Sequence, residues 1–164
     1  MACKGRMTMG TKTVYIGIDP GKGGAIAIVS KTGFYSAKDW PGDETLAAKI
    51  VRNWNLKYNI KLGIIEKVSA MPKQGSVSMF TFGTNYGVWR GILASFEIPF
   101  ILVPPRTWQT KKLDKKAGND TKERSLNTAR RIFPKASLAR KKDNGRSDAL
   151  LIALYAKEYD LVVL

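Results

Sequence analysis

The alternation of apolar and polar residues divides the chain into short strands and amphipathic helices. Runs of β-branched and aromatic residues bounded by glycine, proline or charged residues are typical of strands. They predict five strands, at 13–19, 25–30, 33–38, 60–67 and 100–103. Apolar residues that recur every three or four positions predict helices instead. We expect these at 43–55, 78–95 and 121–132, with a short helical turn at Trp108 and a last helix that starts near Ser147.

The order of these elements predicts the fold class. The first three strands follow one another with only short turns between them, which indicates an antiparallel meander. The last two strands are separated by a helix, which is typical of parallel pairing in an α/β layer fold. We therefore expect a mixed five-stranded sheet flanked by helices. No repeat or second unit is visible, so residues 1–164 are predicted to form one domain with a flexible basic N-terminus at 1–12.

The charge of the chain favours an acidic partner. The sequence holds 28 Lys and Arg against 13 Asp and Glu, a formal net charge of +15. A basic protein without a membrane-spanning stretch points first to nucleic acid and not to a membrane. Segment 111–142 alone carries twelve basic and three acidic residues. We expect a phosphate-binding face there, although a merely solvated surface is the alternative.

The absence of histidine excludes several kinds of chemistry. Ser-His-Asp and Cys-His catalysis and His-ligated zinc all need a residue that the sequence lacks. The lone Cys3 cannot form an internal disulfide, which favours a reducing compartment such as the cytoplasm. No secretory targeting segment is visible in the first residues.

Acidic residues fall at the ends of predicted elements. Asp19 ends the first strand, Glu66 lies near the end of the fourth, and Asp148 opens the last helix shortly after Asp143. Burying such groups together is costly unless a cation lies among them. Hard oxygen ligands without histidine favour Mg²⁺, with Mn²⁺ as a substitute. Two such ions about 4 Å apart can assist an in-line phosphodiester displacement by water. The pattern therefore predicts hydrolysis of a nucleic acid backbone.

Each of these residues also has a purely structural interpretation. Asp19 could cap a turn, Glu66 could pair with a neighbouring cation, and the helix dipole could favour Asp148 at a helix start. Trp40 and Trp108 could stack on bases, or could simply anchor the core or a loop. All three carboxylates being structural, in this order along the chain, is the weaker interpretation.

Taken together, the motifs resemble those of RuvC-type Holliday junction resolvases of the RNase H-like superfamily, and more the viral and phage branch than the bacterial one. The resemblance covers about 13–157. It is carried by segments 16–21, 64–66, 105–108, 118–122 and 147–150, and by Gly87. Each motif is short, and their order and spacing make the resemblance specific. It implies an RNase H-like fold and, for a viral chain, the host cytoplasm.

The resemblance also implies an activity and a set of site residues. It implies a metal-dependent endonuclease that resolves four-way junctions in double-stranded DNA by paired cuts. Asp19, Glu66, Asp148 and Asp143 would hold two Mg²⁺ ions, and Lys122 would steady the scissile phosphate or the attacking water. The expected DNA contacts are Met71, Lys73, Gln74, Lys111, Lys112, Lys115, Lys116 and Lys122. A nuclease for flaps or replication forks, and a non-catalytic basic protein that binds DNA or RNA, stay as alternatives.

The sequence departs from the bacterial pattern at two places. That pattern has an acid three residues before the last one, where this chain has Gly145; Asp143, five residues before Asp148, matches the viral arrangement instead. The family also uses an aromatic residue just after the second acid to open the junction. Segment 69–74 has none, so Met71 and Pro72 are the candidate apolar wedge.

Three glycines in the long helix predict self-association. Gly83, Gly87 and Gly91 recur every four residues and therefore share one face. Each costs a helix about 0.5–1 kcal/mol relative to alanine, so close contact with another backbone is the expected compensation. The resemblance implies a homodimer, whose two equivalent sites would suit paired cuts. The alternative is that the stripe packs on the protein's own sheet.

Overall fold

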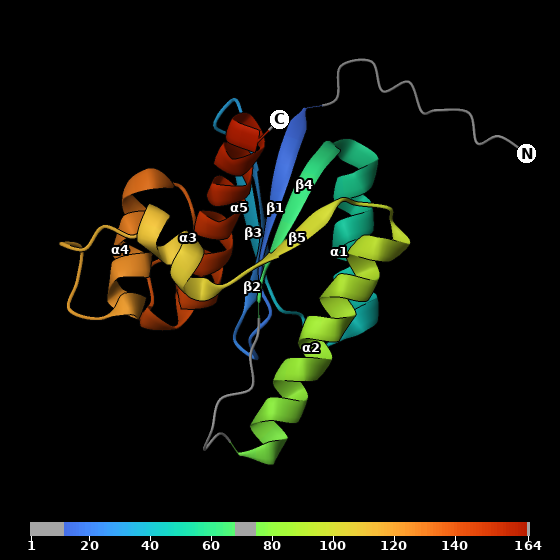
Figure 1. Cartoon of the computed structure of the whole chain (residues 1–164), viewed down its shortest axis with the longest axis horizontal. Helices are drawn as coiled ribbons and strands as arrows, with labels where there is room; N and C mark the ends of the chain where they lie inside the picture. Colours follow the sequence, from blue (N-terminus) through green and yellow to red (C-terminus); the bar gives the residue numbers. More distant parts are fainter. Residues whose placement is uncertain (1–11, 68–74, 164) are drawn as a thin grey trace, which may run out of the picture.

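A mixed five-stranded sheet forms the centre of the molecule. The computed structural model describes residues 12–67 and 75–163 (Figure 1). The strands are β1 (Thr13–Asp19), β2 (Ala25–Ser30), β3 (Tyr35–Asp39), β4 (Asn59–Glu66) and β5 (Phe100–Val103). Their order is β3-β2-β1-β4-β5, with antiparallel pairing along the meander and parallel pairing of β4 with β1 and β5. The predicted fold class is confirmed.

Five helices surround this sheet within the described residues. They are α1 (Glu44–Lys57), α2 (Ser76–Ser95), α3 (Pro105–Lys112), α4 (Thr121–Ile132) and α5 (Asn144–Val163), with a 3₁₀ turn η1 (Lys141–Asp143) before α5. The Asp43 side chain caps α1 as expected, accepting a bond from the Leu46 amide over 2.8 Å. Among the helices, two differ most from the expectation. A full helix, α3, stands where only a turn at Trp108 was predicted, and α5 begins at Asn144 rather than near Ser147.

The helices form a layer on each face of the sheet (Figure 1). Helices α1 and α2 cover one face, where Ile16, Ile18 and Trp89 belong to one buried core. Helices α3, α4 and α5 cover the other face, where Tyr15 and Trp108 belong to a second core. The sheet is therefore apolar on both sides, as expected of a layered α/β fold.

The alternation along β1 and β4 decides which face carries the acids. Successive strand residues point to opposite faces. Ile18 packs toward α1 and α2, so Asp19 falls on the face of α5. In β4, Ile64 packs in the core under α5 and Ile65 in the opposite one, so Glu66 shares the α5 face. The two acids therefore end neighbouring parallel strands on the same side of the sheet.

Gly17 allows α5 to lie directly against β1. A Cβ added at this glycine would lie 2.2 Å from both the carbonyl oxygen of Ala149 and the amide nitrogen of Ala153. Any side chain there would push α5 away from the sheet. Asp148 precedes Ala149, so the close approach at Gly17 holds Asp148 over the end of β1 that carries Asp19.

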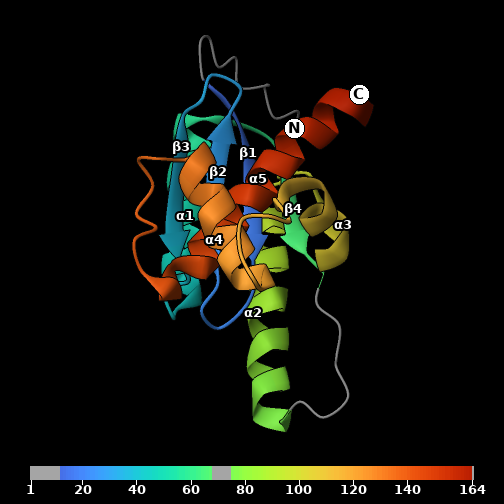
Figure 2. The same ribbon diagram turned by 90° about the vertical axis from the view of Figure 1, so that its left-hand side faces the viewer.

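The N-terminal half of α2 extends beyond the sheet (Figure 2). Val77 and Phe80 are 79% and 78% exposed there. The stripe of Gly83, Gly87 and Gly91 has open space around it within the described residues, so the idea that it packs on the protein's own sheet is wrong. No helix in the described ranges has both the length and the apolar character to cross a membrane.

Candidate active site

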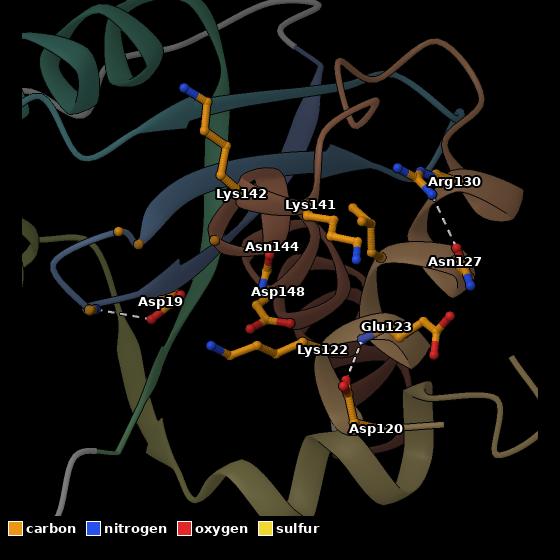
Figure 3. A pocket seen from close by; sticks show the side chains of 15 residues that line it. Asp19, Asp120, Lys122, Glu123, Asn127, Arg130, Lys141, Lys142, Asn144 and Asp148 are labelled. Carbon is orange, nitrogen blue, oxygen red and sulfur yellow. Dashed lines mark hydrogen bonds between the residues drawn. The ribbon is translucent and has the colours of Figure 1, made fainter. Parts of the chain in front are cut away.

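A cavity of about 810 Å³ opens beside the end of β1 (Figure 3). The β1–β2 turn forms one wall, α4 forms the opposite wall, and η1 with the first turns of α5 closes it. The side chains that give it its chemistry are Asp19, Asp120, Lys122, Glu123, Asn127, Arg130, Lys141, Lys142, Asn144 and Asp148. The cavity thus combines two of the predicted carboxylates with a rim on which four basic residues outnumber the two other acids, Asp120 and Glu123.

Three acidic side chains from separate elements influence one another at this end of the sheet. Burial raises the pKa of Glu66 to about 7 and that of Asp148 to about 8, and the charge of Asp19 is the next cause for both. Burial also raises the pKa of Asp19. Glu66 does not line the cavity itself but lies on the neighbouring strand. The structure therefore places Asp19, Glu66 and Asp148 near enough to one another for the charge of one to raise the pKa of another.

Each of these carboxylates accepts a hydrogen bond that orients it. The amide of Gly21 donates to Oδ1 of Asp19 over 3.0 Å, and the indole Nε1 of Trp108 donates to Oε2 of Glu66 over 2.7 Å. The hydroxyl of Ser125 donates to Oδ1 of Asp148. These bonds lower the pKa values that burial raises, and each engages one oxygen of its carboxylate.

The donor set suits a hard divalent cation. Repelling, partly buried carboxylates with oriented oxygens are the surroundings in which Mg²⁺ or Mn²⁺ is favoured. Within residues 12–67 and 75–163, no three or more His, Cys, Asp or Glu side chains are gathered closely enough to form a ready-made metal site. A bound cation would therefore draw the three carboxylates closer by removing their repulsion.

Asp143 does not join this group. Its Oδ1 accepts bonds from Nη2 of Arg140 over 2.8 Å and from Nη2 of Arg146 over 2.6 Å, and its Oδ2 accepts from the Arg140 amide over 2.9 Å. The hydrogen bond from Arg140 is the largest cause that lowers the pKa of Asp143 to about 2. Arg146 also pairs with Asp39 at the end of β3. Arg146 therefore links Asp143, at the end of η1, to the edge strand β3.

The twelve cations of the basic segment 111–142 fall into two groups. Five of its twelve cations are engaged within the protein: Lys112 with Glu158, Arg131 with Asp114, Arg140 with Asp143, and Arg124 and Arg130 with backbone carbonyls of the loops beside α4. The other seven are exposed: Lys111, Lys115, Lys116, Lys122, Lys135, Lys141 and Lys142. Lys112 has a side chain only 9% exposed, so the expectation that it binds DNA needs correction.

The remaining predicted DNA contacts are divided between two regions. Lys122 lines the cavity, and its charge lowers the pKa of Asp148. Lys111, Lys115 and Lys116 are exposed near the end of α3 and in the loop that follows it. Met71, Lys73 and Gln74, like Pro72, lie outside the described residues.

Sequence reasoning missed two residues that orient the acids. Trp108 is fully buried against Glu66, so the stacking role considered for it is wrong. Ser125 is 1% exposed and also lies 3.0 Å, oxygen to oxygen, from Ser147. The signal for Ser125 was a polar residue on the buried face of helix 121–132, four positions before Ala129. For Trp108 no signal identified Glu66 as its partner, because the two lie 42 positions apart.

Comparison with solved structures establishes the fold. A Thermus thermophilus RuvC in complex with a Holliday junction substrate superposes with a TM-score of 0.63 at 14% identity, over 92% of this chain and 96% of that one. A second Thermus thermophilus RuvC structure gives a TM-score of 0.59 at 16% identity, over 90% and 95%. This chain has the RuvC fold. The sheet order and the helical layers described above are therefore those of RuvC.

Comparison with curated proteins adds a similarity in sequence. The chain is 34% identical over 96 residues to the chloroplastic Holliday junction resolvase MOC1 of Chlamydomonas reinhardtii. The match spans 57% of this chain and 11% of that much longer protein. No protein-family model matches the chain.

Proposed function

We propose that this protein is a metal-dependent endonuclease that resolves Holliday junctions by hydrolysing phosphodiester bonds. One observation carries the proposal: Asp19, Glu66 and Asp148 converge from β1, β4 and α5 beside a cavity with a basic rim. The RuvC fold and the similarity to a protein named as a Holliday junction resolvase support the substrate class. The substrate is thus branched double-stranded DNA.

Asp19, Glu66 and Asp148 would hold the metal, which we take to be two Mg²⁺ ions replaceable by Mn²⁺. When bound, these ions supply Lewis-acid activation of water and neutralise charge on the leaving oxygen. The protein's own groups orient the ligands. Gly21, Trp108 and Ser125 orient the three carboxylates. The protein needs no nucleophile of its own, because water takes that role.

Lys122 would steady the scissile phosphate. It lies on the first turn of α4 and faces the cavity beside Asp148 (Figure 3). Lys141 and Lys142 line the same cavity and extend the positive rim away from the acids. A flexible ammonium group acts as a point charge for phosphate. The two walls therefore suit a DNA strand whose reacting phosphate sits between the carboxylates and Lys122.

A cleavage assay tests the function directly. End-labelled junction, flap, fork and linear duplex DNA would be incubated with Mg²⁺, with Mn²⁺ or with chelator. We expect metal-dependent paired cuts in the junction, and loss of cutting without loss of binding in Asp19→Asn, Glu66→Gln and Asp148→Asn. Preferential cutting of flaps or forks would favour the alternative of a nuclease for flaps or replication forks. Binding without cutting in either Mg²⁺ or Mn²⁺ would favour the non-catalytic basic protein that binds DNA or RNA.

We also propose that the protein acts as a homodimer. The apolar residues Val77 and Phe80 are exposed on α2, and the open glycine stripe on the same helix lets another backbone approach. Light scattering should give twice the chain mass of 18.2 kDa. The variant Gly87→Leu should give monomers that lose paired cutting. A wild-type protein that stays monomeric with junction DNA would contradict the dimer.

Two broader expectations accompany this function. We infer a single nuclease domain, supported by one sheet whose two faces are each covered by helices. We also infer a viral or phage origin from the position of Asp143 relative to Asp148. The genes that flank its own would test that origin.

A further inference from the structure

Three residues shortly before Asp148 have different surroundings: other side chains, the cavity, or the backbone of the β1–β2 turn. Asp143, Asn144 and Gly145 are consecutive, and all three lie at the start of α5 or in the turn before it. Asp143 is 3% exposed and turned toward Arg140 and Arg146, which engage both of its oxygens. Both oxygens thus face these arginines, and Asp143 is not among the residues that line the cavity.

Gly145 is closed to any side chain. A Cβ added there would lie 2.1 Å from the carbonyl oxygen of Gly23 and 2.9 Å from the Cα of Gly24. The β1–β2 turn is therefore packed backbone to backbone against the first turn of α5. An acid at position 145, as the bacterial pattern has it, would force these two elements apart.

Asn144 is the member of this trio whose side chain faces the cavity. It lies four positions before Asp148, so the two share one face of α5. Both line the cavity with Asp19, and Figure 3 draws the Asn144 amide beside Asp148 with no hydrogen bond to the other residues shown. Its carbonyl Oδ1 is a hard, neutral oxygen of the kind that divalent cations accept as a ligand.

We propose that Asn144, and not Asp143, supplies the fourth side-chain oxygen to the divalent cations of the site. The proposal rests on the metal-dependent function above. A neutral amide adds a ligand without adding to the repulsion among Asp19, Glu66 and Asp148. It also leaves Asp143 free to tie η1, which carries Lys141 and Lys142, to β3 through Arg146.

Calorimetric titration of the DNA-free protein with Mn²⁺ tests the assignment without relying on cleavage. Asn144→Ala should weaken Mn²⁺ binding by about tenfold or more, while Asn144→Asp, which keeps an oxygen at the same place, should restore or strengthen it. Asp143→Asn is the matched control. It should lower the melting temperature but leave Mn²⁺ affinity within about threefold.

The outcomes separate this proposal from the proposed function. If Asn144→Ala binds Mn²⁺ like the wild type, or if Asp143→Asn alone loses binding while it remains folded by circular dichroism, the assignment is overturned although the nuclease function stands. If wild-type protein neither binds Mn²⁺ nor cuts junctions, both fall together. Weakened binding in Asn144→Ala with rescue in Asn144→Asp supports the assignment.

Discussion

The indole of Trp108 donates a hydrogen bond to Oε2 of Glu66 over 2.7 Å, and the ring itself is fully buried. Trp108 lies on α3 and Glu66 at the end of β4, so the bond joins two elements that are distant in sequence. An indole has one donor and a fixed direction. The bond therefore fixes Oε2 of Glu66 in one direction.

Replacing Trp108 by Phe should impair metal use while leaving DNA binding intact. Phe keeps most of the buried apolar surface and removes the donor to Glu66. We expect a 10- to 100-fold loss in Mg²⁺ affinity or cleavage rate, the usual cost of removing a partner of a metal ligand. Mg²⁺ titrations of cleavage, with junction binding measured separately, check this.

Trp89→Phe is the control for that variant. Trp89 is equally buried, but its indole nitrogen has no hydrogen-bond partner within the described residues. The loss of packing against Trp40 should lower stability and leave the Mg²⁺ dependence unchanged. A similar shift of the Mg²⁺ dependence in both variants would mean that packing, and not the bond to Glu66, is responsible.

Ser125→Ala should slow cleavage by about tenfold or more, because it removes the hydroxyl that orients Asp148. Ser147→Ala is the matched comparison, since its hydroxyl donates to the carbonyl of Asn144 and approaches Ser125 without bonding to Asp148. Single-turnover rates on saturating junction DNA distinguish them. Equal rates for Ser125→Ala and wild type would remove Ser125 from the positioning of Asp148.

The stability of the metal-free protein should fall as pH rises. The folded-state pKa values of Glu66 and Asp148, about 7 and about 8, lie above the ordinary carboxyl range. The folded state therefore binds more protons than the unfolded state between about pH 4 and pH 8, and its stability decreases with pH across that window. Below the window both states are protonated, so the penalty disappears.

Thermal melts in chelator from pH 5 to pH 9 measure this effect. Asp148→Asn should flatten the decrease and raise the melting temperature at pH 8, because an amide carries no charge to bury. Adding Mg²⁺ at pH 8 should stabilise the wild type more than Asp148→Asn. A variant that melts like the wild type at every pH would show that Asp148 is not strained by burial.

Exposed and engaged lysines should differ in their effect on DNA binding. Replacing Lys115 and Lys116 together by Ala should reduce the magnitude of the salt-dependence slope by up to about 1.8, at about 0.9 per phosphate contact. Lys112→Ala should lower stability, because Lys112 pairs with Glu158, and should leave the slope unchanged. Junction binding measured at several salt concentrations separates the two. The opposite pattern would mean that DNA reaches the α3–α5 contact instead.

Much of the fold followed from the pattern of residues. The bounds of β1, β2, β5 and α4 match the predicted ranges because turn residues or caps stand at their ends. β3 begins at Tyr35 rather than at position 33, because Gly33 adopts a φ of 85° in the turn before it. α3 was underestimated because its helical run is short and polar apart from Trp108.

The site was only partly predictable, because contacts distant in sequence decide it. The three acids could be identified from their places at element ends, but not the donors that orient them. Asp143 is a case where the signal was present. Arg140 and Arg146 lie three positions before and after it, a spacing that favours ion pairs. Gly145 leaves no room for a side chain because the β1–β2 turn packs against it at Gly23, a contact between distant segments that no local pattern reveals.

Because successive residues of β1 point to opposite faces of the sheet, the candidate site is sensitive to an insertion within this strand. Inserting one residue after Gly17 would exchange the faces of all residues that follow it in the strand, and Asp19 would turn toward α1 and α2. Inserting two residues would return Asp19 to the α5 face but move it one step along the sheet. Selection on length within this strand should therefore be stricter than selection on the identity of its apolar residues.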